Sequence, residues 1–174
     1  MADTRATLIF VYGTLKTGLC NYAVYVQPAI EQGRAAFVGA ARSTNDEFHM
    51  MLNDEGFFPC LYRVPKGEGD RVAGEVFSVD DDTIAALDAF ERVDDRFYVR
   101  DVLDVDLVDG KRKGETVTCQ VYLMPVYDDL ARLERITNYT AAMNTQFARA
   151  MTTPHSELVE SILAKMKERQ KTAQ

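Results

Sequence analysis

Short apolar segments separated by turn residues fill the first two thirds of the chain, and this spacing constrains the fold more than any other feature. The first segment, 7–12 (TLIFVY), is β-branched and aromatic and ends at Gly13, which is typical of a buried strand followed by a tight loop. In 97–108 apolar and acidic residues alternate, and after Asp109-Gly110 the run 115–124 supplies an antiparallel partner. Further segments of this kind are AAFVGA from 35, FHMML from 48, CLYRV from 60 and RVAGEVFSV from 71. The pattern predicts many short strands.

Helix signals are fewer and lie mostly at the end of the chain. The acidic triplet 80–82 offers N-caps for a short helix that ends near Phe90. The segment 128–151 is helix-prone, and Thr153-Pro154 resembles the start of another helix over 154–170. We therefore expect one α+β domain over 1–174, in which a small mixed or antiparallel β-barrel with flanking helices (about 7–126) precedes a helical extension (about 128–171).

Composition excludes several classes of protein. Twenty basic against 27 acidic residues give a net charge of -7, which opposes binding to nucleic acid or to an anionic membrane. No basic leader precedes a long apolar stretch, and no apolar run approaches the roughly 20 residues that span a bilayer. We interpret Cys20, Cys60 and Cys119, which are far apart, as reduced core thiols of a cytoplasmic protein. The two histidines, His49 and His155, are too isolated to predict a metal site.

Two local features are candidates for chemistry, and the first is the loop 12–18 (YGTLKTG). A loop that leaves a buried strand with glycines at both ends can turn its backbone N–H groups toward an anionic ligand, because glycine allows close approach and positive φ. The same residues also fit an ordinary turn after a strand. The loop matches neither the phosphate loop GxxxxGK[ST] nor the GxGxxG motif, so it gives little support to nucleotide binding.

The second feature is Glu91, at the end of the short helix in the run 87–91 (LDAFE). The negative end of a helix dipole and burial beside Phe90 would both raise the pKa of this carboxyl group by a unit or more, and a raised pKa suits a group that carries protons near neutral pH. A solvated glutamate at a helix end is the alternative interpretation. Tyr98 and Arg100 either orient a substrate or simply share one face of a strand.

Taken together, these motifs resemble the γ-glutamylcyclotransferase-like family, and within it the γ-glutamylamine cyclotransferase and AIG2-like branch. The resemblance covers about 8–125, and its motifs are VYGTLK at 11–16 with Gly18 and Asn21, GEVFSVD at 74–80, LDAFE at 87–91 and FYVR at 97–100. It implies a small β-barrel with a cavity at one side. The terminal segment from Asp128 lies outside the resemblance.

The resemblance also implies an activity. Members of the family cleave a γ-glutamyl amide without water, because the α-amine of the substrate attacks its own γ-carbonyl, forming 5-oxoproline and releasing an amine. Glu91 corresponds to the catalytic carboxylate, and the loop residues Tyr12, Gly13, Thr14 and Leu15 correspond to the substrate-holding loop. Tyr98 is a further substrate-binding candidate. No metal or other cofactor is implied.

Other functions stay open on the sequence alone. A non-catalytic protein that binds a small molecule or γ-glutamyl peptide on the same barrel is one alternative, although binding a zwitterion does not require a proton carrier at Glu91. An interaction module is another, in which the amphipathic terminal helices form a partner groove or a homodimer face. The leaving amine is also undecided between the ε-amine of lysine, the α-amine of an amino acid and other amines, and glutathione is not excluded as a substrate.

Overall fold

A computed structural model describes residues 6–53, 58–126 and 132–150, together with 157, 160, 161, 163, 164, 167 and 168. The strands are β1 (Thr7–Val11), β2 (Ala35–Ser43), β3 (Phe48–Leu52), β4 (Pro59–Arg63), β5 (Ala73–Val79), β6 (Val99–Leu107), β7 (Thr116–Leu123) and β8 (Glu134–Ile136). The helices are the π-helix η1 (Tyr22–Val26), α1 (Gln27–Glu31), α2 (Asp81–Phe90) and α3 (Ala141–Ala150). In the part of the chain that the structure describes, no helix is both long and apolar enough to cross a bilayer.

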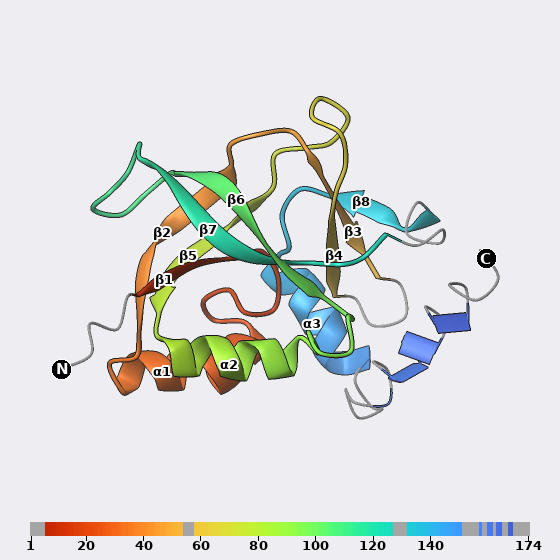
Figure 1. Ribbon diagram of the computed structural model, residues 1–174, viewed down its shortest axis with the longest axis horizontal. Helices are drawn as coiled ribbons and strands as arrows, with labels where there is room; N and C mark the ends of the chain where they lie inside the picture. Colours follow the sequence, from red (N-terminus) through yellow and green to blue (C-terminus); the bar gives the residue numbers. More distant parts are fainter. Residues whose placement is uncertain are drawn as a thin grey trace.

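Five strands close into a barrel in the order β1-β5-β2-β6-β7 (Figure 1). The neighbours β1/β5, β5/β2, β2/β6 and β6/β7 are antiparallel, whereas β1 and β7 close the barrel in parallel through Ile9 opposite Gln120. The predicted mixed β-barrel with flanking helices is therefore confirmed. In Figure 1, α1 and α2 lie together along one side of this barrel.

The remaining strands form a second sheet, β4-β3-β8, which the sequence pattern did not separate from the barrel. Its strand β8 corrects the prediction of a continuous helix over 128–151, because Glu134–Ile136 is extended and pairs with β3. Ile136 lies opposite Met50, where a buried position in a sheet satisfies an apolar residue as well as a helix face does. Residues 127–131 and most of 151–174, including much of the second expected helix, lie outside the described residues.

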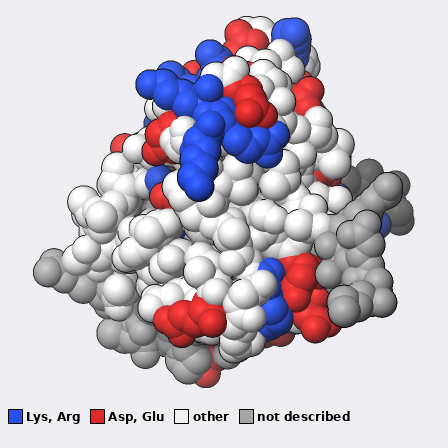
Figure 2. Space-filling model, turned by 90° about the vertical axis from the view of Figure 1, so that its left-hand side faces the viewer, with Lys and Arg blue, Asp and Glu red and all other residues white. Residues whose placement is uncertain are grey.

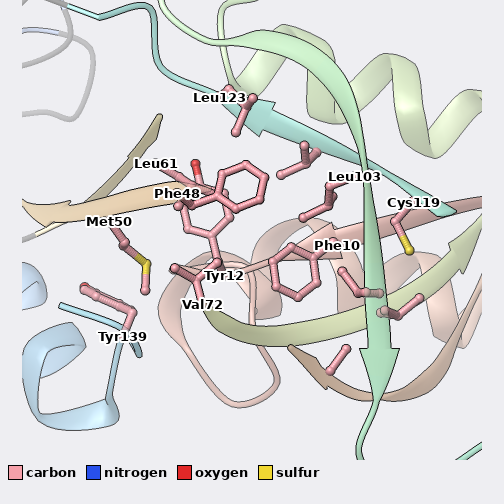
Figure 3. Packing of buried hydrophobic residues seen from close by; sticks show 14 of the residues in the cluster. Phe10, Tyr12, Phe48, Met50, Leu61, Val72, Leu103, Cys119, Leu123 and Tyr139 are labelled. Atoms are coloured by element: carbon pink, nitrogen blue, oxygen red, sulfur yellow. The ribbon is translucent and has the colours of Figure 1, made fainter. Parts of the chain in front are cut away.

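Strand β1 is apolar throughout because its two faces enter two different clusters. Ile9 and Val11 belong to a cluster that includes the buried apolar residues of α1 and α2, while Phe10 and Tyr12 belong to a second cluster between the barrel and the second sheet. Figure 3 shows the second cluster, in which Phe10, Leu103 and Cys119 of the barrel meet residues of the second sheet and Tyr139, just before α3. The residues of the second sheet labelled there are Phe48, Met50 and Leu61. A strand with both faces buried produces an unbroken apolar run, and the loop after it is placed between the two clusters.

Charge is unevenly distributed over the surface. On the face in Figure 2, Lys and Arg side chains gather mainly in one area, and Asp and Glu form smaller separate groups. Among the described residues, several arginines form ion pairs with nearby acidic side chains, as Arg112 does with Glu115 (2.8 Å). Much of the rest of this face is uncharged.

Candidate active site

A cavity opens where β1 ends, between the loop that follows β1 and the C-terminal end of α2. Its lining combines the loop, Glu91 and a large set of aromatic side chains, and consists of residues 10–15, Phe58, Pro59, Phe90, Glu91, Phe97, Tyr98, Tyr122 and Phe147. The predicted catalytic residue Glu91 and the five predicted substrate-binding residues, Tyr12, Gly13, Thr14, Leu15 and Tyr98, therefore line one cavity, whereas the further candidate Arg100 does not.

The loop presents backbone donors at this cavity. Within the described residues, the N–H groups of Gly13, Thr14 and Leu15 donate to no backbone or side-chain acceptor. The carbonyl groups behave differently: the Gly13 oxygen accepts from the Lys16 amide (3.0 Å), and the Thr14 oxygen accepts from the amides at 21 and 22 (both 3.1 Å). Amide donors that line a cavity and lack an internal partner are suited to an anion or a developing oxyanion.

Side chains from distant strands and loops hold the loop in this shape. Asn21 Nδ2 donates to the Thr14 hydroxyl (2.7 Å), and Glu75 of β5 accepts from both the amide and the hydroxyl of Thr17 (2.8 Å each). Lys16 Nζ donates to Asn138 (2.9 Å). Because these contacts fix both ends of the turn, the three donors keep their direction without a ligand, which is the preorganisation that oxyanion binding requires.

Gly13 is required here because of the space it leaves. A Cβ added at Gly13 would lie 2.5 Å from Cγ of Pro59, the residue that begins β4. Gly18, at the other end of the loop, has φ of +78° but open space around its α-carbon. The two glycines thus serve different purposes, close approach at Gly13 and a left-handed backbone at Gly18.

We expect Gly13→Ala to lower the free energy of unfolding by about 1 to 3 kcal/mol, because either the loop or β4 must shift to admit the methyl group. Gly18→Ala is the matched control, and it should lower stability by about 1 kcal/mol through backbone strain alone. Urea unfolding measures both changes in stability. The affinity of each folded variant for a γ-glutamyl amide, measured by titration, reports whether the amide donors of the loop are still in place. Equal stability and equal ligand affinity in the two variants would contradict the close-approach role of Gly13.

The end of α2 aims Glu91 at the cavity. Asp80 caps the start of the helix by accepting from the Thr83 amide (2.9 Å), and Glu91 is the C-cap residue. At the C-terminus, the Val93 amide donates to the Asp88 carbonyl (3.0 Å) and the Arg92 amide to the Ala89 carbonyl (3.3 Å), which is a Schellman motif. Arg92 takes the left-handed position that glycine usually fills, with φ of 53°.

The loop after α2 folds back, so that Phe97 and Tyr98 return to the cavity next to Glu91. The Tyr98 amide donates to the Glu91 carbonyl (3.3 Å), so Phe97 and Tyr98 line the cavity beside the glutamate. The Arg92 guanidinium forms ion pairs with Asp95 and Glu160 (2.6 Å each) outside the cavity. The orientation of Glu91 is therefore fixed by backbone bonds on both sides of it.

Burial governs the ionisation of Glu91. Its side chain is half-buried, and the surface it keeps faces the cavity. Burial raises the pKa of Glu91 from its ordinary value to about 8, as the sequence predicted in direction, and loss of hydration is the cause. Burial raises the pKa values of the nearby phenols Tyr12, Tyr25 and Tyr122, and the negative charge of Glu91 adds to this effect. A carboxyl group with this pKa exchanges protons near neutral pH.

The same pKa makes Glu91 unfavourable for stability above acidic pH. The unfolded chain releases the proton near pH 4.3, whereas the folded protein keeps it to about pH 8, so stability falls as pH rises between these values. We expect Glu91→Gln to remove this slope and to raise the free energy of unfolding at pH 8 by on the order of 2 kcal/mol. Urea unfolding at about pH 5 and pH 8 tests this. A wild type and a variant with equal pH slopes would contradict the raised pKa.

Comparison with known proteins agrees with this geometry. A family model described as "Gamma-glutamyl cyclotransferase, AIG2-like" matches residues 9–141, which include both the loop and Glu91. The chain belongs to this AIG2-like γ-glutamyl cyclotransferase family. Its predicted family resemblance is thereby confirmed.

Individual relatives support membership of the AIG2-like family. The chain is 36% identical over 121 residues to gamma-glutamylaminecyclotransferase B of Danio rerio, which covers 70% of this chain but only 61% of that protein. It is 41% identical over 123 residues to gamma-glutamylaminecyclotransferase of Bos taurus, covering 71% of this chain and 68% of that one. The crystal structure of an AIG2-like protein from Mus musculus superposes with a TM-score of 0.68 and 28% identity over 87% of this chain and 93% of that chain.

In this member of the AIG2-like family, the two tyrosines predicted to bind substrate line the cavity, and both hydroxyl groups donate to backbone carbonyls. The Tyr12 hydroxyl donates to the Tyr122 carbonyl (2.7 Å), and the Tyr98 hydroxyl donates to the Pro59 carbonyl (3.1 Å). The Tyr122 hydroxyl donates to Asp88 (2.8 Å), which also pairs with Arg100 (3.2 Å). Arg100 thus acts behind Tyr122 and does not line the cavity.

Several lining residues of this AIG2-like cavity escaped the sequence reasoning, namely Phe58, Pro59, Phe97, Tyr122 and Phe147. They come from β4, β7, α3 and two loops, and they meet only because the barrel and the second sheet are packed together. An aromatic residue within a strand or helix looks the same whether it faces a core or a cavity. The described residues contain no group of three or more His, Cys, Asp or Glu side chains arranged to hold a metal ion.

Proposed function

We propose that this protein is a γ-glutamylamine cyclotransferase, which converts a γ-glutamyl amide into 5-oxoproline and a free amine. The observation that carries the proposal is the half-buried carboxyl group of Glu91 in the same cavity as the unpaired amides of Gly13–Leu15. The names of the Danio rerio and Bos taurus relatives support the same reaction class. We assign Glu91 as the catalytic residue and Tyr12, Gly13, Thr14, Leu15 and Tyr98 as substrate-binding residues.

The first step of the reaction needs a base. The substrate carries an α-ammonium group, which has no free electron pair, and the Glu91 carboxylate accepts one of its protons. The freed α-nitrogen then attacks the γ-carbonyl carbon and closes a five-membered ring. Aromatic walls from Phe97 and Tyr98 hold the glutamyl chain folded, so that the nitrogen and the carbon approach to about 3 to 3.5 Å.

The second step needs an acid and an anion site. Ring closure places negative charge on the carbonyl oxygen, and the amides of Gly13–Leu15 are suited to bind either this oxygen or the α-carboxylate of the substrate. The protonated Glu91 donates to the leaving nitrogen as the carbon–nitrogen bond breaks. Over the reaction two protons leave the α-nitrogen and two reach the leaving amine, so the proton count balances and no water is consumed.

The reaction has its nucleophile, electrophile and leaving group in one substrate, so we propose that it proceeds without a cofactor. We also propose a cytoplasmic location, supported by three free cysteines, of which Cys60 and Cys119 are buried. The homodimer through the terminal helices stays a prediction.

A substrate panel tests the proposal. Purified protein is incubated with γ-glutamyl amines, γ-glutamyl amino acids and glutathione, with and without a chelator, and 5-oxoproline and glutamate are both quantified. We expect 5-oxoproline with an equal amount of amine. Glutamate as the main product would mean hydrolysis, and saturable binding without any product would mean the non-catalytic alternative.

A further inference from the structure

Helix α3 contributes one side chain to the cavity, and that side chain is not used in the mechanism above. Phe147 is 5% exposed and lines the cavity. The inward face of α3 also carries Met143, which packs on the second cluster, and Asn144, whose side chain accepts from the Cys20 amide (3.4 Å). These contacts place α3 against the loop that holds the amide donors, so Phe147 has a fixed position beside the reaction site.

The polar groups of the cavity already match the glutamyl half of the substrate. Glu91 is the one charged side chain among the described lining residues, and it faces the α-ammonium group in the proposed reaction. The amides of Gly13–Leu15 take an anionic oxygen. The hydroxyls of Tyr12, Tyr98 and Tyr122 are all donated to protein acceptors. The part of the lining that remains for the leaving amine is aromatic, and it includes Phe58 and Phe147.

We propose that Phe147 is a specificity-determining residue that contacts the leaving amine and favours amines with an aromatic ring one carbon away from the nitrogen, such as benzylamine. This inference rests on the proposed function. A ring in this position buries apolar surface and makes edge or stacked contacts with other rings. A carboxylate in the same position, as in a γ-glutamyl amino acid, would lose its hydration against the same wall.

The location of Phe147 gives this inference a further consequence. The family match ends at residue 141, the first residue of α3, so the barrel, the loop and Glu91 lie inside the matched segment and Phe147 lies outside it. Relatives that share the reaction can therefore differ at this wall. Of the two wall residues, Phe58 lies inside the matched segment, so the selectivity that varies between relatives is expected to come from Phe147.

The test compares γ-glutamylbenzylamide, γ-glutamylmethylamide and γ-glutamylglycine. In all three the leaving nitrogen carries one carbon atom, and this carbon bears a phenyl ring, a hydrogen or a carboxylate, respectively. For the wild type we expect kcat/KM to be at least about tenfold higher for the benzylamide than for either of the others. Phe147→Ala should reduce this preference by about tenfold while changing the methylamide rate by less than about threefold. Gln146→Ala, on the exposed side of α3, is the matched control and should leave the preference unchanged.

The outcomes separate the inference from the proposed function. If no amide yields 5-oxoproline, the proposed function fails. If all three react but the wild type shows no preference for the benzylamide, or if folded Phe147→Ala keeps that preference or loses all three rates equally, the inference alone is overturned. Phe147→Leu keeps an apolar side chain in the core and replaces Phe147→Ala if that variant does not fold, with the same loss of benzylamide preference expected.

Discussion

Replacing Glu91 with Gln is expected to lower kcat for 5-oxoproline formation by at least about a hundredfold. The amide keeps the size of the side chain and its place in the cavity, but it cannot accept a proton from the α-ammonium group or return one to the leaving nitrogen. In the described structure Glu91 is the one ionisable carboxyl group that lines the cavity, so no neighbour there replaces it as the base.

The experiment measures kcat and substrate affinity separately for wild type and Glu91→Gln. Binding of a γ-glutamyl amide, followed by calorimetry, should persist in the variant because the loop amides and the aromatic walls are intact. Asp94→Asn is the matched control, since Asp94 is an exposed acid three residues further along the chain, and this change should leave kcat within about twofold. Activity of Glu91→Gln close to that of wild type would assign the proton transfer to another group.

The parts of the site that were predictable from sequence are those that depend on local structure. The loop after β1 follows from an apolar strand that ends at Gly13, and Glu91 follows from a helix capped at Asp80 that ends near Phe90. Each of these features is contained within about ten residues, so spacing and residue type suffice. Their presence in one cavity is a matter of packing, and only the family resemblance linked them in advance.

Other parts of the fold depend on contacts between distant segments. Strand β8 exists because Glu134–Ile136 pairs with β3, more than 80 residues earlier in the chain. Without knowledge of the pairing with β3, the apolar Ile136 is equally compatible with the buried face of a helix. Phe58 and Phe147 likewise belong to the cavity through the packing of the second sheet and α3 on the barrel. Local patterns carry no information about such pairings, which are decided by the burial available in the folded chain.

The structure of the α2 C-terminus explains both the inward orientation of Glu91 and its raised pKa. A glycine at position 92 would adopt the left-handed conformation without strain, yet this chain has Arg92 there at φ of 53°. The guanidinium pairs with Asp95 and with Glu160 from the C-terminal part of the chain, so the same turn that directs Glu91 inward is also fixed from outside. An inward glutamate is desolvated, and desolvation is what raises its pKa.

That raised pKa leads to the second large expected effect, which is on the pH dependence of the rate. Glu91 accepts a proton only as a carboxylate, and burial raises its pKa to about 8, so kcat/KM should fall about tenfold for each pH unit below that value. A glutamate with an ordinary pKa of about 4.3 would instead give a rate limited only by the substrate amine across the neutral range. The two cases differ most between about pH 6 and pH 8.

The substrate amine titrates too, so the profile is measured for wild type and for Glu91→Gln with the same γ-glutamyl amide. The residual rate of the variant follows the substrate alone, and the ratio of the two profiles isolates Glu91. We expect this ratio to rise with pH and to level off above about pH 8, because the carboxylate is then fully formed. A ratio that is constant from about pH 6 to pH 8 would mean that the group that carries the proton has an unshifted pKa, and it would contradict the raised pKa of Glu91 in the reaction.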